Sequence, residues 1–328
     1  MSNKPKILVA RAIFPDQLAK LEESFEVRSN QADQVFTPEE LQKELSNVVG
    51  ALVTGSERID ASTLADAKSL KIVANIAVGY NNFDVPAITA AGVMASNTPG
   101  VLTDTTADFG FALLMATARR ITESEHWIRN GQWDQWSIVH NPLGMDLHHS
   151  TLGIIGMGRI GQGIAKRALG FGMKVIYHNR SRLPEADENA CGATYVSKEE
   201  LLRTADHVVL VLPYTPQNHH TIGAKEIALM KPTATLVNIA RGGIVDDMAL
   251  AQALKEKKIF AAGLDVFEGE PKVNPELLKL SNIVLAPHIA SASEKTRRAM
   301  VDLAADNLRA ALAGQKPPSL INTELLKS

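Results

Sequence analysis

One stretch, residues 151–179, constrains the fold of this 328-residue chain more than any other. It opens with the apolar run Leu-Gly-Ile-Ile at residues 152–155, which is typical of a strand buried on both faces. The pattern G-x-G-x-x-G follows at residues 156–161, and apolar residues at helical spacing continue to residue 169. A second apolar run, at residues 175–177, predicts another buried strand. The stretch therefore predicts a strand, a glycine turn, a helix and a strand in about 30 residues.

Each glycine of this pattern has a physical role in the predicted turn. Gly156 permits the tight turn, Gly158 lets the backbone approach a pyrophosphate, and Gly161 lets the helix pack close to the strand. The start of the helix offers free N–H groups and the positive end of the helix dipole. We therefore expect dinucleotide binding at this turn. The residues expected to bind the cofactor here also include Met157, Arg159 and Ile160.

The residues after the second predicted strand indicate which dinucleotide is bound. An NAD site usually has Asp or Glu at this position, bonded to the 2′-hydroxyl of the ribose. Here the position is Asn179, followed by Arg180, Ser181 and Arg182. Asn does not repel a 2′-phosphate, and two guanidinium groups with a hydroxyl can bind one. We therefore predict a preference for NADP(H), with NAD(H) as the second cofactor; the simpler interpretation is a solvated basic loop.

Bulk composition excludes several classes of protein. The formal net charge is −2 and 45% of residues are hydrophobic, which gives no support to a nucleic-acid or anionic-membrane surface. Cys191 is the only cysteine, so no internal disulfide can form, which suits a reducing cytoplasm. No apolar run approaches the ~18 residues of a membrane span, and the run at residues 7–10 is too short for a signal peptide. We expect a cytoplasmic globular protein.

Predicted strands and helices alternate through most of the chain, which favours parallel sheets with helices on both faces. The strands are too many for one open sheet, so we expect two doubly wound, Rossmann-like α/β domains with a cleft between them. The last long helix is predicted to return to the first domain. Residues 1–99 and 290–328 are therefore assigned to a discontinuous, flavodoxin-like substrate domain, and residues 100–289 to an NADP-binding Rossmann domain.

Several helix starts are recognisable from their chemistry. Thr37 and Glu40 form a capping-box pattern, with Pro at the first helical position. Asp84 and Asp246 are expected to begin the helices that follow them. A further helix is expected at residues 61–67.

Residues 131–150 form a long segment without a regular pattern. All three tryptophans, Trp127, Trp133 and Trp136, lie in or beside it, within ten residues of one another. An irregular segment of this length inside a compact chain is usually functional, and tryptophan clusters suit subunit interfaces. We therefore expect a subunit contact here; the alternative is that the tryptophans only cap the core.

Two loops follow predicted strands of the first domain and carry glycine. They contain Thr54 and Gly55, and Val78 and Gly79. Ligands of doubly wound sheets bind beyond the carboxyl ends of the strands, which makes both loops candidates for substrate binding. Ordinary turn glycines are an equally good explanation from the residues alone.

Polar residues also follow three predicted strands of the second domain. They are Arg241, Glu268 or Glu270, and His288, and parallel strands bring them to one edge of the sheet. Reduction of a 2-oxo acid places negative charge on a carbonyl oxygen, which His can protonate and Arg can polarise while it binds the carboxylate. A carboxylate on the other imidazole nitrogen would fix the tautomer. Spacing alone does not choose between the two glutamates.

Other polar residues near these strand ends have further interpretations. Asp265, at the end of its strand, is a candidate acceptor for the nicotinamide carboxamide. The adjacent pairs His148–His149 and His219–His220 point to opposite sides in an extended chain, so we interpret them as surface or interface residues. The histidines show no spacing typical of metal ligands, and no metal is expected.

Taken together, these motifs resemble the NAD(P)-dependent D-2-hydroxyacid dehydrogenase family. The matching segments are residues 156–161, 238–242, 263–271 and 286–289, together with residues 75–80. They occur in order and cover essentially the whole chain, so the combination is highly specific. Within the family the chain is most similar to the glyoxylate/hydroxypyruvate reductases, including the bacterial 2-ketogluconate reductase branch.

The resemblance implies an oxidoreductase that reduces small 2-oxo acids to D-2-hydroxy acids with NADPH. Glyoxylate, hydroxypyruvate and 2-ketogluconate are the candidate substrates. The implied catalytic triad is Arg241, Glu270 and His288, which selects Glu270 over Glu268.

The resemblance also implies roles outside the triad. Val78 and Gly79 are expected to bind the substrate carboxylate through backbone N–H groups, and Asp265 is expected to contact the nicotinamide. A homodimer is expected, built on an arm at about residues 100–150, with Trp136 reaching the partner's active site. Further residues expected near the cofactor are Pro213, Ile239 and Thr106.

Two alternatives stay open at this point. One is an NAD-preferring enzyme of the D-lactate dehydrogenase type, which Arg180 and Arg182 disfavour. The other is a dinucleotide-sensing binding protein that keeps the fold without the activity.

Overall fold

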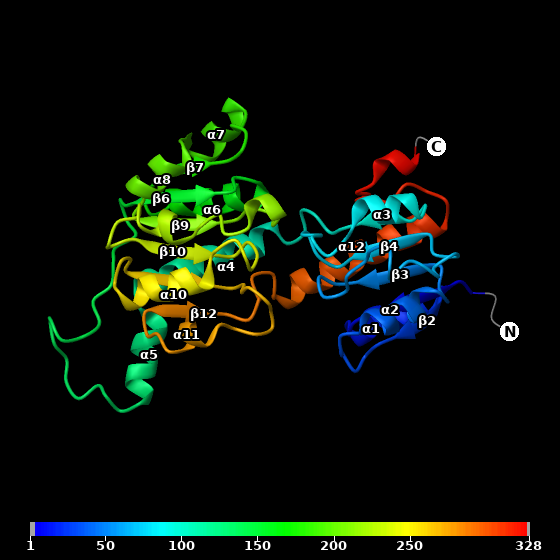
Figure 1. Cartoon of the computed structure of the whole chain (residues 1–328), viewed down its shortest axis with the longest axis horizontal. Helices are drawn as coiled ribbons and strands as arrows, with labels where there is room; N and C mark the ends of the chain where they lie inside the picture. The colour runs from blue at the N-terminus through cyan, green and yellow to red at the C-terminus, as the bar shows by residue number, and fades with distance from the viewer. Residues whose placement is uncertain (1–3, 327–328) are drawn as a thin grey trace. The chain divides into compact units, whose positions relative to one another are not determined.

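The computed structural model describes residues 4–326 of the chain. The chain forms two compact units (Figure 1). One, here called the terminal unit, contains the residues up to Leu102 and those from Ala292 onward; the other, the central unit, is Thr103–Ser291. The predicted domain boundaries lie within a few residues of this division.

The terminal unit contains a five-stranded parallel sheet in the order β2-β1-β3-β4-β5. Side chains alternate between its two faces: Leu8 and Val53 pack against α2 and α3, whereas α12 crosses β3 and β4 on the other face, beside α1. The strands are β1 (Lys6–Val9), β2 (Glu26–Ser29), β3 (Gly50–Val53), β4 (Ile72–Asn75) and β5 (Met94–Ser96). The helices are α1 (Pro15–Glu22), α2 (Pro38–Leu45), α3 (Val85–Ala90), α12 (Glu294–Leu312) and the short η2 (Thr323–Leu326).

The central unit contains a seven-stranded parallel sheet in the order β12-β11-β10-β9-β6-β7-β8. The strand order reverses beside β6, which is the position where open α/β sheets bind ligands. The strands are β6 (Thr151–Ile155), β7 (Lys174–His178), β8 (Ala193–Tyr195), β9 (His207–Leu210), β10 (Thr235–Asn238), β11 (Ala261–Leu264) and β12 (Ile283–Leu285).

Helices cover both faces of this sheet (Figure 1). Leu152 and Ile154 of β6 face the core shared with α4, α6 and α7, whereas Ile155 faces the core shared with α8, α9, α10 and α11. The helices are α4 (Thr103–Ala118), α5 (Ile121–Arg129), α6 (Arg159–Leu169), α7 (Glu185–Cys191), α8 (Lys198–Thr204), η1 (Pro216–Asn218), α9 (Ala224–Ile227), α10 (Asp247–Lys255) and α11 (Pro275–Leu278). The predicted fold class, two doubly wound parallel-sheet units, is therefore confirmed. Among residues 4–326, no helix combines the length and the apolar character needed to cross a bilayer.

The predicted helix starts are confirmed. Thr37 and Glu40 form both bonds of a capping box at α2. The Asp84 side chain accepts a hydrogen bond from the Ala87 N–H at the start of α3, and Asp246 accepts one from the Ala249 N–H at the start of α10. Each side chain satisfies an N–H that the helix itself leaves unpaired.

Two local expectations differ from the structure. Residues 61–66 form consecutive turns instead of the helix expected at residues 61–67. The Asp60 carboxylate accepts bonds from the N–H groups of Ser62 and Thr63, and most of the following backbone bonds span only three residues. The edge strands β2 and β8 were not expected. Each is short and partly polar, so its sequence lacks a clear strand pattern, and it is stabilised by pairing with the neighbouring strand of the sheet.

Candidate active site

The glycine turn between β6 and α6 has the geometry that its pattern predicts. Gly156 has a φ of +103°, and a Cβ there would lie 2.5 Å from the Val211 backbone. A Cβ on Gly161 would lie 2.3 Å from the Gly156 carbonyl oxygen. A Cβ on Gly158, in contrast, would meet no atom within 4 Å. The outer two glycines therefore allow close packing, and the middle one leaves open space in front of the helix.

The start of α6 fits the phosphates of a dinucleotide. Gly158 occupies the N-cap position without a side-chain cap, so the first N–H groups of the helix are left to a ligand. The Oγ1 atom of Thr106 in α4 is buried and has no hydrogen-bond partner within residues 4–326. A buried polar atom without a partner is costly, and a polar group of the cofactor would satisfy it. Among the other expected cofactor residues, Met157 and Ile239 are buried whereas Arg159 and Pro213 are exposed.

Asn179 holds the glycine turn from the end of β7. Its side-chain oxygen accepts a 2.7 Å hydrogen bond from the Met157 N–H. Arg180 and Ser181, the next two residues, are exposed. Within residues 4–326, the Arg180 side chain has no hydrogen bond or ion pair. Arg180 can therefore bind an anion without breaking an existing contact.

Arg182 is held by a buried carboxylate. Its Nε and Nη2 atoms donate to the two oxygens of Glu188, at 2.9 and 2.7 Å, and the Tyr177 hydroxyl donates to the same carboxylate at 2.6 Å. The bonds from Arg182 and then from Tyr177 lower the pKa of Glu188 to about 2. The two predicted phosphate ligands therefore differ, because Arg182 has a fixed orientation and Arg180 does not.

Glu188→Gln is expected to lower the melting temperature at pH 7, because the amide removes the charge partner of Arg182. The pKa of Glu188 is depressed, so its stabilising effect is present above the ordinary value near 4.5 and is lost as pH falls toward about 2. In thermal unfolding, the difference between variant and wild type should stay constant from pH 7 to about pH 5 and shrink as pH falls further toward about pH 3. Glu185→Gln, on the exposed side of the same helix, is the control and should behave as wild type. A pH-independent difference would contradict the assignment.

His288 and Glu270 form the centre of the candidate site. They follow the neighbouring strands β12 and β11, and His288 Nδ1 lies 2.8 Å from Glu270 Oε2. The other oxygen of Glu270 accepts the Phe267 N–H at 2.8 Å. Burial opposes ionisation of Glu270, but the bonds from His288 and Phe267 outweigh it and lower the pKa of this carboxyl. The carboxylate therefore fixes Nδ1 as a donor and leaves Nε2 to a substrate.

Arg241 lies on the next strand end, after β10. Its backbone turn is held by Asn238, whose side chain accepts the Ala240 N–H and donates to the Arg241 carbonyl oxygen. A Cβ on Gly242 would lie 1.7 Å from the Phe267 carbonyl oxygen, so only glycine lets this turn pack against the turn that carries Glu270. Burial lowers the pKa of Arg241 and Glu270 raises it. The guanidinium stays charged at neutral pH.

Asp265, which was expected to contact the nicotinamide, also holds the backbone of the turn that carries His288. It is fully buried, and its two carboxylate oxygens accept the N–H groups of Ile289 and Ala290, at 2.8 and 2.9 Å. Its carbonyl oxygen accepts the His288 N–H at 2.8 Å. Burial is the largest influence on Asp265 and raises its pKa, while the two N–H groups lower it. Asp265 thus fixes the turn in which His288 has a φ of +56°.

In the terminal unit, Val78 and Gly79 present unpaired donors. Their carbonyl oxygens accept bonds from the side chains of Asn97 and Asn75. Neither N–H has a hydrogen-bond partner among residues 4–326. Two consecutive free N–H groups on a fixed turn are suited to a carboxylate.

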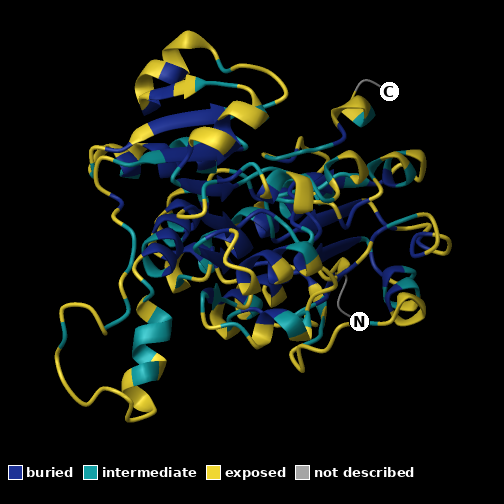
Figure 2. Ribbon diagram, turned by 60° about the vertical axis from the view of Figure 1, so that its left-hand side comes forward, coloured by how far each residue is buried: buried dark blue, intermediate teal, exposed yellow. Residues whose placement is uncertain are grey.

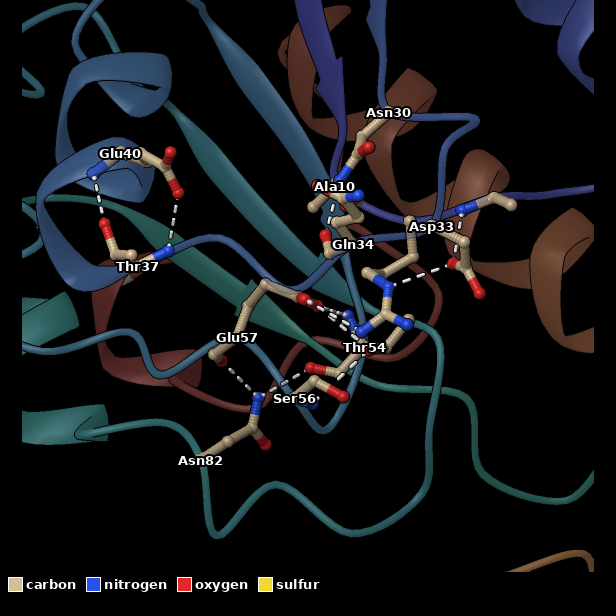
Figure 3. A network of polar contacts seen from close by, with 12 residues as sticks. Ala10, Asn30, Asp33, Gln34, Thr37, Glu40, Thr54, Ser56, Glu57 and Asn82 are labelled. Carbon is tan, nitrogen blue, oxygen red and sulfur yellow. Dashed lines mark hydrogen bonds and ion pairs between the residues drawn. The ribbon is translucent and has the colours of Figure 1, made fainter. Parts of the chain in front are cut away.

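Thr54 is arranged differently, as Figure 3 shows. Its N–H and hydroxyl both donate to Glu57 Oε2, at 2.7 and 2.9 Å. The Asn82 side chain donates to the carbonyl oxygens of Thr54 and Glu57, which ties the two candidate loops of the terminal unit together (Figure 3). Gly55 has open space around its Cα. Of these two loops, the Val78 loop therefore has free N–H groups among the described residues, whereas the donors of Thr54 are already used.

The tryptophan segment is exposed. None of the residues of α5 is buried, and the loop that follows α5 is drawn largely in yellow in Figure 2. Trp136 is 73% exposed and Trp133 is 51% exposed. The apolar residues exposed with them are Ile121, Ile128, Ile138, Val139 and Leu143. An apolar surface of this kind is typical of a protein–protein contact.

The expectation that adjacent histidines point to opposite sides is wrong. The rings of His219 and His220 are stacked with centroids 3.8 Å apart, and those of His148 and His149 meet at 5.5 Å. The second residue of each pair has a positive φ, +50° at His220 and +61° at His149. A left-handed residue reverses the alternation of an extended chain and brings both rings to one side.

Several residues that hold the candidate loops within each unit were not singled out in the sequence as site residues. Asn238, Glu57, Asn75, Asn82 and Asn97 act through their side-chain bonds to loop backbones. For the four asparagines the available signal was an Asn at a strand end or in the turn that follows, where amide side chains commonly bond to the backbone.

Comparisons with known proteins identify the family to which this chain is similar. Residues 111–290 match the family model described as D-isomer specific 2-hydroxyacid dehydrogenase, NAD binding domain. Glyoxylate reductase of Thermococcus kodakarensis is 48% identical over 327 residues, 99% of this chain and 98% of the relative. Glyoxylate reductase of Pyrococcus furiosus is 46% identical, over 99% of this chain and 97% of the relative.

Solved structures agree as well. The NADPH-dependent glyoxylate/hydroxypyruvate reductase of Sinorhizobium meliloti, in complex with NADP and malonate, superposes with a TM-score of 0.86 at 34% identity. The match covers 98% of this chain and 97% of that structure. The match to the family model and the full-length similarity to relatives agree with the motifs and with the fold. The chain therefore belongs to the D-isomer specific 2-hydroxyacid dehydrogenase family and is an NAD(P)-dependent oxidoreductase.

Proposed function

We propose that this protein reduces glyoxylate and related small 2-oxo acids to D-2-hydroxy acids with NADPH. The observation that carries the proposal is the hydrogen bond between His288 Nδ1 and Glu270 beside the turn of Arg241, on the sheet edge that holds the glycine turn. The names of the relatives support glyoxylate as the first substrate. Hydroxypyruvate and 2-ketogluconate are proposed as further substrates.

The proposed mechanism assigns one task to each side chain. When bound, the reduced nicotinamide supplies the hydride. The His288 Nε2–H donates a proton to the carbonyl oxygen of the substrate, and Glu270 stabilises the charged imidazole through Nδ1. Arg241 binds the substrate carboxylate and polarises the carbonyl group. We also propose Val78 and Gly79 as carboxylate ligands, supported by their unpaired N–H groups.

A substrate panel with both cofactors tests the proposal. Purified protein should oxidise NADPH with glyoxylate, and the panel should include hydroxypyruvate, 2-ketogluconate and pyruvate. Negligible turnover with every acid, despite cofactor binding, would support a dinucleotide-sensing protein instead. A preference for NADH with pyruvate would support an enzyme of the D-lactate dehydrogenase type.

We propose NADP(H) as the preferred cofactor, with Arg180 as the principal ligand of the 2′-phosphate. Arg180→Ala should lower kcat/KM for NADPH by roughly 10–100-fold, the usual range for a lost charge-assisted hydrogen bond, and leave the value for NADH almost unchanged. Steady-state kinetics with both cofactors measure this. Arg203→Ala, an exposed arginine of α8, is the control. An equal loss of kcat/KM with both cofactors would show that Arg180 does not distinguish NADPH from NADH.

We propose a homodimer in which α5 and the segment after it form the contact. The helix has no buried residue within its own chain, and the apolar surface around Trp133 and Trp136 supports burial against a second copy. A cytoplasmic location is part of the proposal, supported by the buried free thiol of Cys191, which suits a reducing compartment.

Trp136→Ala is expected to change KM for at least one substrate of the panel, because the indole is proposed to contribute to the partner's active site. The steady-state KM for each acid measures the effect, and analytical ultracentrifugation reports whether the dimer persists. Unchanged KM values for every substrate in a variant that remains dimeric would limit Trp136 to a structural role.

A further inference from the structure

A second cluster of titratable side chains lies in the central unit, outside the triad. It consists of His219 and His220, which follow η1, and Glu268, in the turn after β11. One nitrogen of each imidazole and a carboxylate oxygen of Glu268 lie within 4.8 Å of one another. Glu268 lies more than 45 positions after both histidines, so the cluster forms only in the folded protein.

The separations in this cluster match those between ligands of one small cation. His220 Nε2 lies 3.1 Å from Glu268 Oε2, and His219 Nε2 lies 3.8 Å from Glu268 Oε1. Two atoms that each lie 2.0–2.1 Å from a tetrahedral Zn²⁺ are roughly 3.3 Å apart. A cation could therefore replace the proton shared between imidazole and carboxylate with a small shift of the side chains.

The other nitrogen of each imidazole already faces a polar partner. His219 Nδ1 lies 3.3 Å from the Tyr214 hydroxyl, and His220 Nδ1 lies 3.7 Å from Asp246 Oδ2. Metal-binding histidines usually have such an outer partner, which orients the ring and leaves the second nitrogen to the metal. Here Tyr214 and Asp246 face the Nδ1 atoms, which leaves the Nε2 atom of each imidazole toward Glu268.

Backbone hydrogen bonds fix the positions of the proposed ligands. The His220 N–H donates to the Gly243 carbonyl oxygen at 2.7 Å, and the Glu268 N–H donates to Asp247 Oδ2 at 3.2 Å. A Cβ on Gly243 would lie 3.2 Å from His219 Nδ1, so glycine makes room for the imidazole. The backbone of His220 and Glu268 is thus held before any cation binds, and only the side chains must rotate, which reduces the entropic cost of binding.

We propose that His219, His220 and Glu268 bind one divalent transition-metal cation of the Zn²⁺ class. Two imidazole nitrogens and one carboxylate suit Zn²⁺ and leave the fourth position to water. Binding requires the two ring planes, now 22° from parallel, to open so that both Nε2 lone pairs point to the cation. The His219 side chain is 42% exposed and has room to rotate. Because Glu268 lies two residues before Glu270, the cation would also hold the turn that carries Glu270.

Zn²⁺ and Co²⁺ alone are the probes, added to the untagged full chain after a chelator has been applied and removed. We expect about one Zn²⁺ per chain by calorimetry and a Co²⁺ absorption spectrum typical of a tetrahedral site. Zn²⁺ should raise the melting temperature, because it binds the folded state preferentially. His219→Asn, His220→Asn and Glu268→Gln should each weaken binding by at least roughly tenfold.

The variants are chosen to keep the local structure. Asn tolerates the positive φ of His220, and Gln can still accept a hydrogen bond from that residue. His148→Asn is the matched control, since it alters the other adjacent histidine pair, and it should bind Zn²⁺ as wild type does. Melting in the presence of chelator shows whether each variant is folded. Absence of saturable Zn²⁺ binding to wild type, or wild-type affinity in all three variants, would overturn the proposal and leave the proposed reductase activity untouched.

Discussion

His288→Gln is expected to lower kcat for glyoxylate reduction by about 10²–10⁴-fold, the usual contribution of a positioned general acid. Gln cannot donate a proton of the required acidity to the carbonyl oxygen. The hydrogen bond between His288 Nδ1 and Glu270 is the geometric basis of this expectation. Cofactor affinity, measured by quenching or enhancement of NADPH fluorescence, should stay near the wild-type value, because the cofactor phosphates are expected at the glycine turn.

A second variant separates chemistry from backbone strain at this position. His288 has a φ of +56°, which Asn tolerates better than Gln. His288→Asn should therefore lose activity to a similar extent while it unfolds at a temperature closer to that of wild type. If either folded variant kept wild-type kcat, His288 would have no part in proton transfer.

Arg241→Lys is expected to lower kcat/KM for glyoxylate by about 10²–10³-fold, although the positive charge is retained. The ammonium group of Lys is a point charge and cannot form the two parallel hydrogen bonds of a guanidinium with a carboxylate. The loss should appear in both KM and kcat, because Arg241 is proposed to bind the carboxylate and to polarise the carbonyl group.

The control for this change is Arg203→Lys, on the exposed face of α8, which should leave the kinetics unchanged. Arg241→Lys must also bind NADPH normally for the loss to be assigned to the substrate. Kinetics equal to wild type would show that one positive charge is sufficient and that the two parallel hydrogen bonds of the Arg241 guanidinium are not needed.

Much of the fold was predictable from local patterns. The glycine turn at residues 156–161, the capping box of Thr37 and the caps formed by Asp84 and Asp246 all depend on interactions within a few residues, and the structure has each of them. The helix expected at residues 61–67 is wrong for a related reason. Asp60 caps this segment as it would cap a helix, but most of the backbone bonds that follow span only three residues, so the turns do not continue as an α-helix.

Candidate catalytic residues were predictable as types and positions, but their roles were not. Spacing left Glu268 and Glu270 equivalent, and only the resemblance to a family separated them. In the structure, Glu270 bonds to His288 whereas Glu268 lies beside His219 and His220. The turn after β11 points the two carboxylates to different neighbours, and these neighbours lie in other loops, after β12 for Glu270 and after η1 for Glu268.

By itself, the sequence determined the two parallel-sheet units, the glycine turn and the order in which polar residues follow the strands. The tertiary structure alone decided which donors are free: the N–H of Thr54 is taken by Glu57 and Arg182 is held by Glu188, whereas Arg180 has no such contact within residues 4–326. It also brought His219 and His220 to one side, against Glu268. The reason is physical: periodicity and capping act over a few residues of chain, whereas the pairing of polar groups depends on neighbours that only folding brings within hydrogen-bonding distance.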